Sequence, residues 1–504
     1  DIKNFRQLNS KTAGHPEYGH LPGIETTTGP LGQGLGNAVG FAIAEEFVAA
    51  RWGNHLCDHF TYVLAGDGCL MEGISQEVIS LAGRLRLKKL IVIWDDNGIT
   101  IDGPLDLSCN TDQISRFKSS GWSTFSCDAH NPTEIDQAIS NAKKDPRPSL
   151  IAAKSIIGYG SKGKQGTSGV HGAALGKSEV EKLRNNFNWG YKEFVIPSNI
   201  KNAWGKIGQK NHQMFKDWSD RFQSLSENKK TAFSNELDQI FPSKLTRGIK
   251  SFKKFHSQKI ENDLATRKAS EICLDLINDC FKNTVGGSAD LTGSNNTKTK
   301  ALEVFSEVNR SGRYIHYGIR EHGMAAIMNG MALHGGVIPY GGTFLAFSDY
   351  CRGAIRLSAL MGLGVIYVMT HDSIGLGEDG PTHQPVEHLA ALRAIPNLNV
   401  FRPADAVETA ESWQCALENK TGPSLICLTR QKTDFAERTS SLENNVKKGG
   451  YIIRNVENPE AVIIATGSEL GLAEKVCNEL TDKSIRLVSM PCVDLFDKQD
   501  DHYK

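Results

Sequence analysis

Asp67 and Asn97 are the side chains of this sequence whose types and spacing point most directly to a chemistry. Each follows an apolar run, and each offers a hard oxygen ligand of the kind that Mg²⁺ or Ca²⁺ prefers. Two protein ligands are too few to enclose such a cation, so diphosphate oxygens are expected to complete its shell. Gly66 and Gly68 flank the aspartate and would let the backbone approach phosphates without a Cβ in the way. The pattern therefore indicates a metal-dependent diphosphate site.

The elements that must position these side chains lie in the same stretch. The apolar runs 62–68 and 91–97 each predict a buried parallel strand that ends at the carboxyl edge of a sheet, where ligands of open α/β sheets bind. Between them, residues 71–85 carry apolar side chains at helical spacing, which completes a right-handed strand–helix–strand unit. A Gly-Asp-Gly alone would equally suit a local strand-to-helix turn. The asparagine after a second strand favours the ligand site.

This order of strand, Gly-Asp-Gly, helix and strand-ending asparagine resembles the thiamine diphosphate motif, and further segments extend the resemblance to transketolases along essentially the whole chain. The segments that carry it are Gly14–Glu17, Thr28–Gly34, Gly66–Gly73, His171–Ala173, Gly287–Leu291, Ile319–His322, Gly342–Phe344 and Thr370–His383. The resemblance implies an α/β fold of successive parallel-sheet domains with helices on both faces. It also implies thiamine diphosphate as the cofactor, with Mg²⁺, for which Ca²⁺ or Mn²⁺ can substitute.

The resemblance also implies which residues contact the cofactor and its metal. The metal ligands are expected to be Asp67, Asn97 and Ile99. Contacts with the cofactor are expected for Gly29, Pro30, Leu31, Gly68, Asn97, His171, Glu321, Phe344, Phe347 and Tyr350.

Glu321 stands where an apolar stretch runs into a helical pattern, so a favourable interaction with the helix N-terminus would also explain it. The family resemblance implies another role, in which this glutamate hydrogen-bonds a ring nitrogen of the cofactor's aminopyrimidine. To donate that proton the carboxyl must be neutral, which requires burial to raise its pKa. The nucleophile then belongs to the cofactor, and the protein supplies position and electrostatics.

Phe344, Phe347 and Tyr350 recur every three residues, a spacing that by itself favours a core-facing helical stripe. Their place after Gly341 and Gly342 resembles the family's aromatic wall for the pyrimidine, with Phe347 as the best single candidate. Stacking on such a wall is worth about 0.5–1.5 kcal/mol beyond burial.

Several histidines fall on positions that the family uses. His15, His171 and His371 are implied in catalysis together with Glu321, because imidazole can polarise sugar hydroxyls and move their protons near neutral pH. Single histidines in loops are more often surface residues. Metal binding is the rival interpretation, but these histidines lack His-x-x-x-His spacing.

Substrate contacts are implied for a set that combines histidines, arginines and two small polar residues. They are His171, Arg267, Ser294, His371, Asp379, His383 and Arg430. Among them, Arg267, Ser294 and Arg430, with His383 nearby, resemble the family's ligands of the substrate phosphate, and Asp379 resembles the residue that recognises a donor hydroxyl. A guanidinium suits a phosphate because its planar fork meets two oxygens at once. In isolation each arginine would equally suit a surface ion pair.

The composition excludes several classes of partner. Lys plus Arg equals Asp plus Glu at 57 each, and the pI is about 7.3, so no broad positive field favours nucleic acid or an anionic membrane. No apolar run approaches the ~20 residues of a membrane helix. The 11 cysteines are scattered without Cys-x-x-Cys pairs, which favours a reducing compartment and a cytoplasmic location. Whether an organelle-targeting segment exists stays open.

Four segments are expected along the chain. Residues 1–190 form a diphosphate-binding α/β domain, 191–258 a largely helical connector, 259–435 a pyrimidine-binding α/β domain, and 436–504 the start of a C-terminal domain. Compared with the family, the sequence starts inside the first domain and stops inside the last. We therefore expect a partial chain.

The activity that the resemblance implies is transfer of a two-carbon ketol group in the pentose phosphate pathway. The donor is a ketose phosphate such as xylulose 5-phosphate, and the acceptor is an aldose phosphate such as ribose 5-phosphate or erythrose 4-phosphate. A homodimer with active sites at the subunit interface is also implied. Dihydroxyacetone synthase and a 1-deoxyxylulose-phosphate synthase-like enzyme are the alternatives with similar chemistry. An inactive cofactor-binding scaffold or regulatory protein is the alternative of another class.

Overall fold

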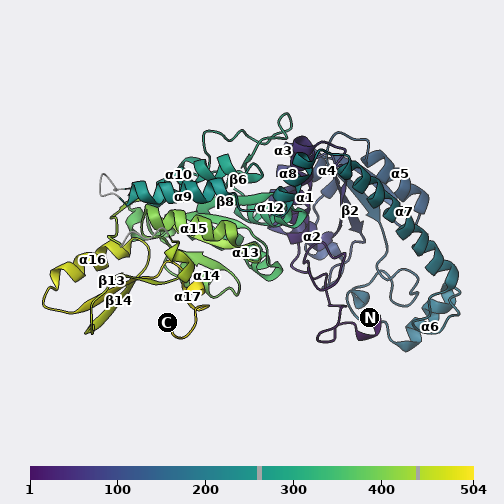
Figure 1. Ribbon diagram of the computed structural model, residues 1–504. Coiled ribbons are helices and arrows are strands. Elements are labelled where there is room, and N and C mark those ends of the chain that lie inside the picture. The colour runs from purple at the N-terminus through teal and green to yellow at the C-terminus, as the bar shows by residue number, and fades with distance from the viewer. Residues whose placement is uncertain (258–263, 439–442) are drawn as a thin grey trace. The chain divides into compact units, whose positions relative to one another are not determined.

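The computed structural model describes residues 1–257, 264–438 and 443–504, whose contacts group them into two compact units (Figure 1). One unit is Pro30–Asn235, and the other joins Asp1–Gly29 to Glu236–Lys504. The boundary expected between residues 258 and 259 lies outside the described residues. The domain limits inferred from the sequence stay predictions.

The unit Pro30–Asn235 is built on a four-stranded parallel sheet with the order β1-β2-β4-β3. Its strands are β1 (Thr61–Gly66), β2 (Leu90–Asp96), β3 (Ser123–Asp128) and β4 (Ser149–Lys154). Its α-helices are α1 (Gln33–Trp52), α2 (Asp67–Met71), α3 (Gly73–Leu85), α4 (Gln113–Ser119), α5 (Pro132–Ala142), α6 (Lys177–Asn186) and α7 (Ser198–Gln223), followed by α8 (Glu227–Leu237), which ends just past the unit. The strand–helix–strand unit expected from the sequence is confirmed, because β1 and β2 pair in parallel across α2 and α3.

The expectation that both strands are buried is wrong for β1. This strand lies at the edge of the sheet, where Tyr62 and Leu64 are exposed. Alternate side chains of a strand point to opposite faces, and α1 packs against β1, whereas the described residues leave the face of Tyr62 and Leu64 uncovered. β2 lies between β1 and β4 and is mostly buried, as expected.

The second unit contains a six-stranded parallel sheet with the order β10-β11-β9-β8-β6-β7. Its strands are β6 (Thr284–Ser288), β7 (Tyr314–His316), β8 (Ile338–Phe344), β9 (Ile366–Thr370), β10 (Asn399–Phe401) and β11 (Ser424–Leu428). The α-helices of this part are α9 (Ser243–His256), α10 (Thr266–Cys280), α11 (Thr292–Asn295), α12 (Glu321–His334), α13 (Ser348–Met361), α14 (His388–Arg393) and α15 (Ala406–Glu418). A short antiparallel pair joins β5 (Leu264–Ala265) to β12 (Lys432–Thr433).

The chain ends in a smaller three-stranded sheet with the order β13-β15-β14, in which only β13 runs antiparallel to its neighbour. Its elements are β13 (Tyr451–Arg454), β14 (Ala461–Ala465), α16 (Glu469–Glu479), β15 (Ile485–Ser489) and α17 (Val493–Phe496). Among the described helices of the whole chain, none is long and apolar enough to cross a membrane.

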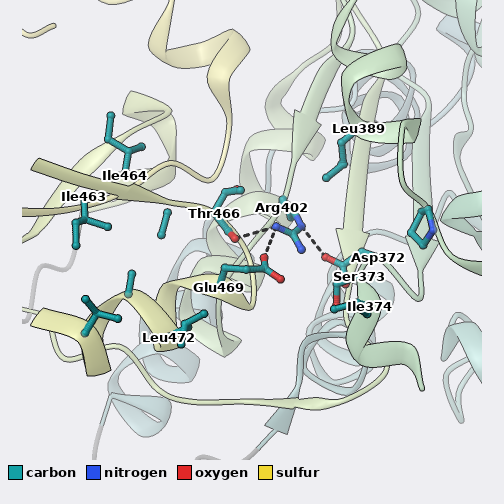
Figure 2. Close-up of a pocket in the computed structure, with 14 residues that line it drawn as sticks. Asp372, Ser373, Ile374, Leu389, Arg402, Ile463, Ile464, Thr466, Glu469 and Leu472 are labelled. Carbon is teal, nitrogen blue, oxygen red and sulfur yellow. Dashed lines mark hydrogen bonds and ion pairs between the residues drawn. The ribbon is translucent and has the colours of Figure 1, made fainter. Parts of the chain in front are cut away.

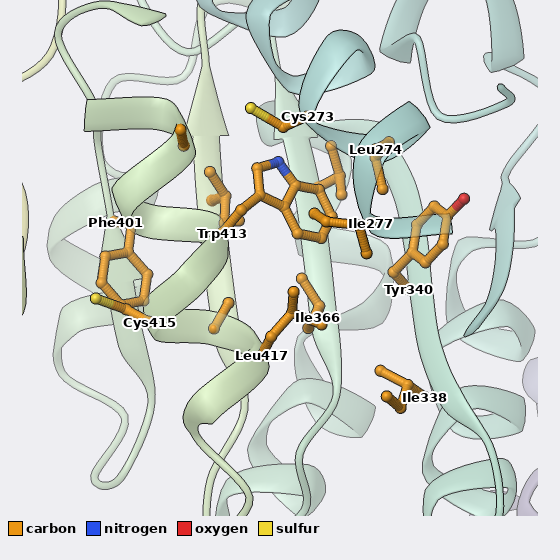
Figure 3. Close-up of a cluster of buried hydrophobic side chains, with 14 of the residues drawn as sticks. Cys273, Leu274, Ile277, Ile338, Tyr340, Ile366, Phe401, Trp413, Cys415 and Leu417 are labelled. Atoms are coloured by element: carbon orange, nitrogen blue, oxygen red, sulfur yellow. The ribbon is translucent and has the colours of Figure 1, made fainter. Parts of the chain in front are cut away.

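Trp413 lies at the centre of the main core of the second unit (Figure 3). Its ring meets Tyr340 edge to face, with the two centroids 6.0 Å apart, and packs among apolar side chains that include Ile277 and Ile366. The indole Nε1 donates to Ser270 Oγ at 2.8 Å, so the polar atom of this buried side chain is satisfied. This core packs α10 and α15 against the six-stranded sheet.

Trp413→Ala should remove this packing and lower the free energy of unfolding by about 3–5 kcal/mol. Thermal unfolding followed by circular dichroism would measure the change in the midpoint. Trp413→Phe is the control, because it keeps an aromatic ring and removes the Nε1 donor, and it should cost less than the alanine variant. An unchanged midpoint for Trp413→Ala would contradict a central role for this side chain.

Candidate functional site

Asp67 and Asn97 lie at the same edge of the first sheet, as the sequence predicted. β1 and β2 pair with Gly66 opposite Asp95, so the residues that follow both strands leave the sheet at its carboxyl edge. Asp67 is the first residue of α2 and is buried. Trp94 Nε1 donates to Asp67 Oδ1 at 2.9 Å, while Oδ2 is buried without a hydrogen-bond partner in the described part of the chain. Burial raises the pKa of Asp67, and the neighbouring acidic residues add to this rise.

Asn97 shapes the loop that follows β2. Its Oδ1 accepts from the backbone N–H of Ile99 at 2.9 Å, and its Nδ2 donates to Asp95 Oδ2 at 3.0 Å. Gly98 between them has φ +70°, a left-handed conformation that glycine adopts without strain. The amide therefore brings Asn97 and Ile99 into one tight turn beside the strand end.

The remaining residues expected at the diphosphate are distributed over both units. Leu31 packs on Gly68 so closely that a Cβ on the glycine would lie 2.9 Å from Leu31 Cδ1, so packing also requires glycine there. His171 lies on an exposed loop after a 3-10 turn, and Pro30 precedes α1. Gly29 belongs to the other unit, where a Cβ would lie 3.1 Å from the ring of His15.

Glu321 is buried at the first turn of α12. Burial raises the pKa of its carboxyl group, and the amide of Glu321 itself and the Thr343 hydroxyl act against this rise. The sequence predicted a buried glutamate with a raised pKa, and both features are present.

The three aromatic residues do not form a helical stripe, because they lie on three different elements. Phe344 ends β8, Phe347 lies in a 3-10 turn, and Tyr350 is in α13 with 65% of its surface exposed. The rings of Phe344 and Phe347 stack with centroids 5.6 Å apart. The core stripe, which the spacing alone favoured, is thus not observed. The stacked pair lies at the carboxyl edge of the sheet, and the exposed ring of Tyr350 lies 6.0 Å from Phe347 between centroids.

Two histidines contact this aromatic pair. The His371 ring lies 3.7 Å from Phe344 between centroids, and the His383 ring lies 5.2 Å from Phe347. Burial lowers the pKa of His371 to about 4, and the positive charge of Arg267 contributes. His371 is therefore a neutral imidazole at neutral pH.

Three charged residues of the expected substrate set act on the ring of His371. Arg267 and Arg430 lower its pKa and Asp379 opposes them, so all three charges act on one ring. Arg267 Nη1 donates to the carbonyl oxygen of Ser294 at 2.9 Å, which brings together two residues of the expected set.

Glu378 is a neighbour of this set that the sequence did not single out. Its carboxylate accepts from both terminal nitrogens of Arg430, with Nη2 to Oε1 at 2.6 Å and Nη1 to Oε2 at 3.2 Å. Arg430 Nη1 also donates to the carbonyl oxygen of Leu376 at 2.8 Å. The only sequence signal for this pair was the position of Glu378 beside Asp379 in the same loop.

Asp372, the residue after His371, is paired with Arg402 (Figure 2). Arg402 Nε donates to Asp372 Oδ2 at 2.9 Å, and Arg402 Nη1 donates to the carbonyl oxygen of Thr466 at 2.9 Å and pairs with Glu469. These residues line a cavity of about 580 Å³ between the six-stranded sheet and the C-terminal one. The arginine thus links the His371 loop to the last sheet of the chain.

Three family models match successive parts of the chain. Residues 1–245 match the family model described as transketolase, thiamine diphosphate binding domain, and residues 262–434 match the transketolase pyrimidine binding domain. Residues 449–504 match a transketolase-like C-terminal domain. The chain belongs to the transketolase family.

Individual members of the transketolase family resemble the whole chain. A transketolase from Rhodobacter capsulatus is 52% identical over 507 residues, a match that covers 100% of this chain and 75% of the relative. The structure of a transketolase from Leishmania mexicana superposes with a TM-score of 0.95 at 42% identity and covers 100% of this chain and 75% of that one. A transketolase from Pichia stipitis solved with sedoheptulose 7-phosphate gives a TM-score of 0.93 at 42% identity, covering 100% of this chain and 76% of that one.

These matches have consequences for the expectations from the sequence. The α/β fold and the assignment to a transketolase enzyme are confirmed, and the first two matched domains are those that bind thiamine diphosphate. The matches do not bear out the expectation of a partial chain.

His371 should remain neutral down to about pH 4. Because this folded-state pKa lies below the ordinary value of 6.5, the neutral ring stabilises the fold above about pH 6.5, and the contribution is lost as the pH falls toward 4. NMR titration of ring-labelled histidine would measure the pKa directly. Arg267→Met should raise it, while Lys268→Met, which removes a neighbouring exposed cation, is the control. A pKa near 6.5 in the unmodified chain would contradict the assignment.

Proposed function

We propose that this chain binds thiamine diphosphate through a divalent cation and transfers a two-carbon ketol group between sugar phosphates. The observation that carries the proposal is the group of side chains at one sheet edge of the second unit, in which a buried carboxyl, a stacked aromatic pair and a neutral histidine near two arginines lie together. This set combines a proton donor, a ring-stacking surface and an anion site. Xylulose 5-phosphate as donor and ribose 5-phosphate or erythrose 4-phosphate as acceptor match these features.

The metal would lie beside Asp67. The buried Oδ2 of this carboxylate has no hydrogen-bond partner among the described residues, and a cation would supply the missing one. Asn97 would be the second ligand, since its Oδ1 has a lone pair beyond the bond to Ile99, and Ile99 would be the third. A hard cation such as Mg²⁺, Ca²⁺ or Mn²⁺ suits these oxygens. Gly68 and Leu31 would lie beside the diphosphate, with Gly29, Pro30 and His171 as further contacts.

Glu321 would hold a proton toward the cofactor's aminopyrimidine. Its raised pKa supports a neutral carboxyl that can donate to a ring nitrogen. Phe344 and Phe347 would stack on that ring, and the 65% exposure of Tyr350 supports only a peripheral contact. The bound cofactor supplies the nucleophilic carbon that protein side chains lack.

The sugar phosphate would be bound from its two ends. Arg267, Arg430 and Ser294 would bind the phosphate. We add His371, expected from the sequence to act on sugar hydroxyls, to this set because the charges of both arginines act on its ring. Asp379 and His383 would contact the hydroxyl groups of the donor, where His15 and His171 are further candidates. Because Glu378 pairs with Arg430, an arriving phosphate must displace a carboxylate from that guanidinium.

We also propose a homodimer. The residues assigned to the diphosphate and to the pyrimidine lie mostly in different units of the chain, which suits active sites assembled between two subunits. A cytoplasmic location agrees with the 11 free cysteines.

An assay of ketol transfer from xylulose 5-phosphate to ribose 5-phosphate, with Mg²⁺ and thiamine diphosphate, tests the proposed function. Formation of the seven-carbon product is expected, and Glu321→Gln should abolish it while the cofactor still binds. No transfer by the unmodified chain with the cofactor demonstrably bound would contradict the proposal.

Asp67→Asn should weaken binding of thiamine diphosphate by more than about 100-fold, because the amide cannot replace the charged metal ligand. Isothermal calorimetry with Mg²⁺ and with chelator would measure both the affinity and its metal dependence. Asp96→Asn, which removes an equal charge from the end of β2, is the matched control and should bind the cofactor with little change. Equal affinity with metal and with chelator in the unmodified chain would remove the metal from the site.

Arg430→Met should reduce kcat/KM for xylulose 5-phosphate by about 30-fold or more. Hydroxypyruvate, a donor without phosphate, should be much less affected, and the ratio of the two values isolates the phosphate end. Glu378→Gln should act in the opposite direction and lower the KM for the phosphorylated donor, because it removes the competing carboxylate. Equal losses for both donors in Arg430→Met would show that the arginine acts elsewhere.

A further inference from the structure

A chain of buried hydrogen bonds leads from the interior of the second unit to the ring of His371. Ser288 Oγ donates to Asn295 Oδ1 at 2.8 Å, and Asn295 Nδ2 donates to Thr370 Oγ1 at 2.7 Å. Thr370 Oγ1 lies 2.9 Å from His371 Nδ1. Ser288, Asn295 and Thr370 have no exposed surface, and the links between them are direct hydrogen bonds.

The partners of Thr370 favour one position for the proton at the end of the chain. Thr370 Oγ1 accepts from the Asn295 amide, and among the described residues His371 Nδ1 is the one acceptor within reach of its buried hydroxyl proton. If Nδ1 carried a proton instead, the hydroxyl proton would be buried without an acceptor. A neutral imidazole that accepts at Nδ1 carries its proton on Nε2. We infer that Thr370 and Asn295 are positioning residues that hold His371 as its Nε2–H tautomer, so that it offers a hydrogen-bond donor to the substrate phosphate.

The surroundings of His371 require one particular tautomer. Its Nε2 has no hydrogen-bond partner among the described residues, so that nitrogen is available to a ligand. Arg267 and Arg430 act electrostatically on the same ring, which is the environment of an anion site. A phosphate oxygen accepts hydrogen bonds, and only a protonated Nε2 adds a donor to the two guanidinium groups. This role rests on the proposed function, whereas the tautomer itself does not.

His371 combines an unusual backbone conformation with two contacts that hold its side chain. His371 has φ +61°, in the left-handed region that residues other than glycine seldom adopt. Nδ1 is held by Thr370, and the face of the ring is held by Phe344 with 3.7 Å between centroids. The hydrogen bond and the ring contact together restrain the orientation of the imidazole. A proton on Nε2 therefore points in one defined direction.

The tautomer can be measured directly by magic-angle-spinning NMR of the full chain with ring-¹⁵N-labelled histidine. His371→Gln identifies the signals of His371 by their absence. An unprotonated Nδ1 together with a protonated Nε2 at pH 7.5 is expected. A protonated Nδ1 would overturn the inference, and this result would leave the proposed function intact because that function is tested by ketol transfer.

Variants of Thr370 connect the tautomer to substrate binding. Thr370→Val keeps the shape of the side chain and removes the hydroxyl, so both tautomers should be populated and the KM for xylulose 5-phosphate should rise on the order of tenfold. The KM for hydroxypyruvate should change much less. Thr370→Ser restores the hydroxyl and should return both the NMR signals and the KM to those of the unmodified chain.

Asn295→Ala tests the second link, because the Thr370 hydroxyl would then be free to rotate and a mixture of tautomers is expected. A single Nε2–H tautomer in Thr370→Val, or equal changes in KM for both donors, would overturn the inference. If Thr370→Val does not fold, the spectrum of the unmodified chain and the Asn295→Ala variant decide the question.

Discussion

The parallel pairing of β8 and β9 is the constraint on which the candidate site depends. Its register sets Phe344 opposite Thr370, the last residues of their strands. Because parallel strands end at the same edge of a sheet, the residues that follow them, Phe347 and His371, are brought to one place from distant parts of the sequence. A shift of the register by one residue would turn Phe344 and Thr370 to the opposite face and separate the aromatic pair from the histidine.

Several charged groups at this edge are buried and therefore need fixed partners. Asp372 is almost fully buried and is paired with Arg402, which in turn donates to the carbonyl oxygen of Thr466, the residue that follows β14. Removing one member of a buried pair leaves an uncompensated charge, so such a pair tolerates little change. The position of the loop that carries His371 thus depends on residues far beyond the six-stranded sheet. A residue of the C-terminal sheet can in this way influence a site to which it contributes no ligand.

Much of the fold could be predicted from the sequence, because periodicity and strand-ending polar residues report local structure. The apolar run before Asn97 predicted β2, whereas the burial of Glu321 was expected only from the family resemblance, because its place at the start of a helix has a purely local explanation. The exposure of β1 could not be predicted, since it depends on which neighbours cover an edge strand. The Trp94–Asp67 bond and the Glu378–Arg430 pair were also missed, because one spans 27 residues and the other 52. Separations of that size carry no periodic signal.

The left-handed backbone of His371 has a consequence for the variation that this position can tolerate. At φ +61° a Cβ is crowded by the neighbouring carbonyl, and β-branched residues are the least tolerated there. Glycine and asparagine would relieve the strain, yet neither offers an imidazole ring to stack on Phe344. Two requirements therefore limit the residue types at this position: the left-handed backbone conformation and the imidazole ring. Few substitutions at position 371 would therefore be tolerated. Mutant libraries of this chain should vary the neighbouring residues instead.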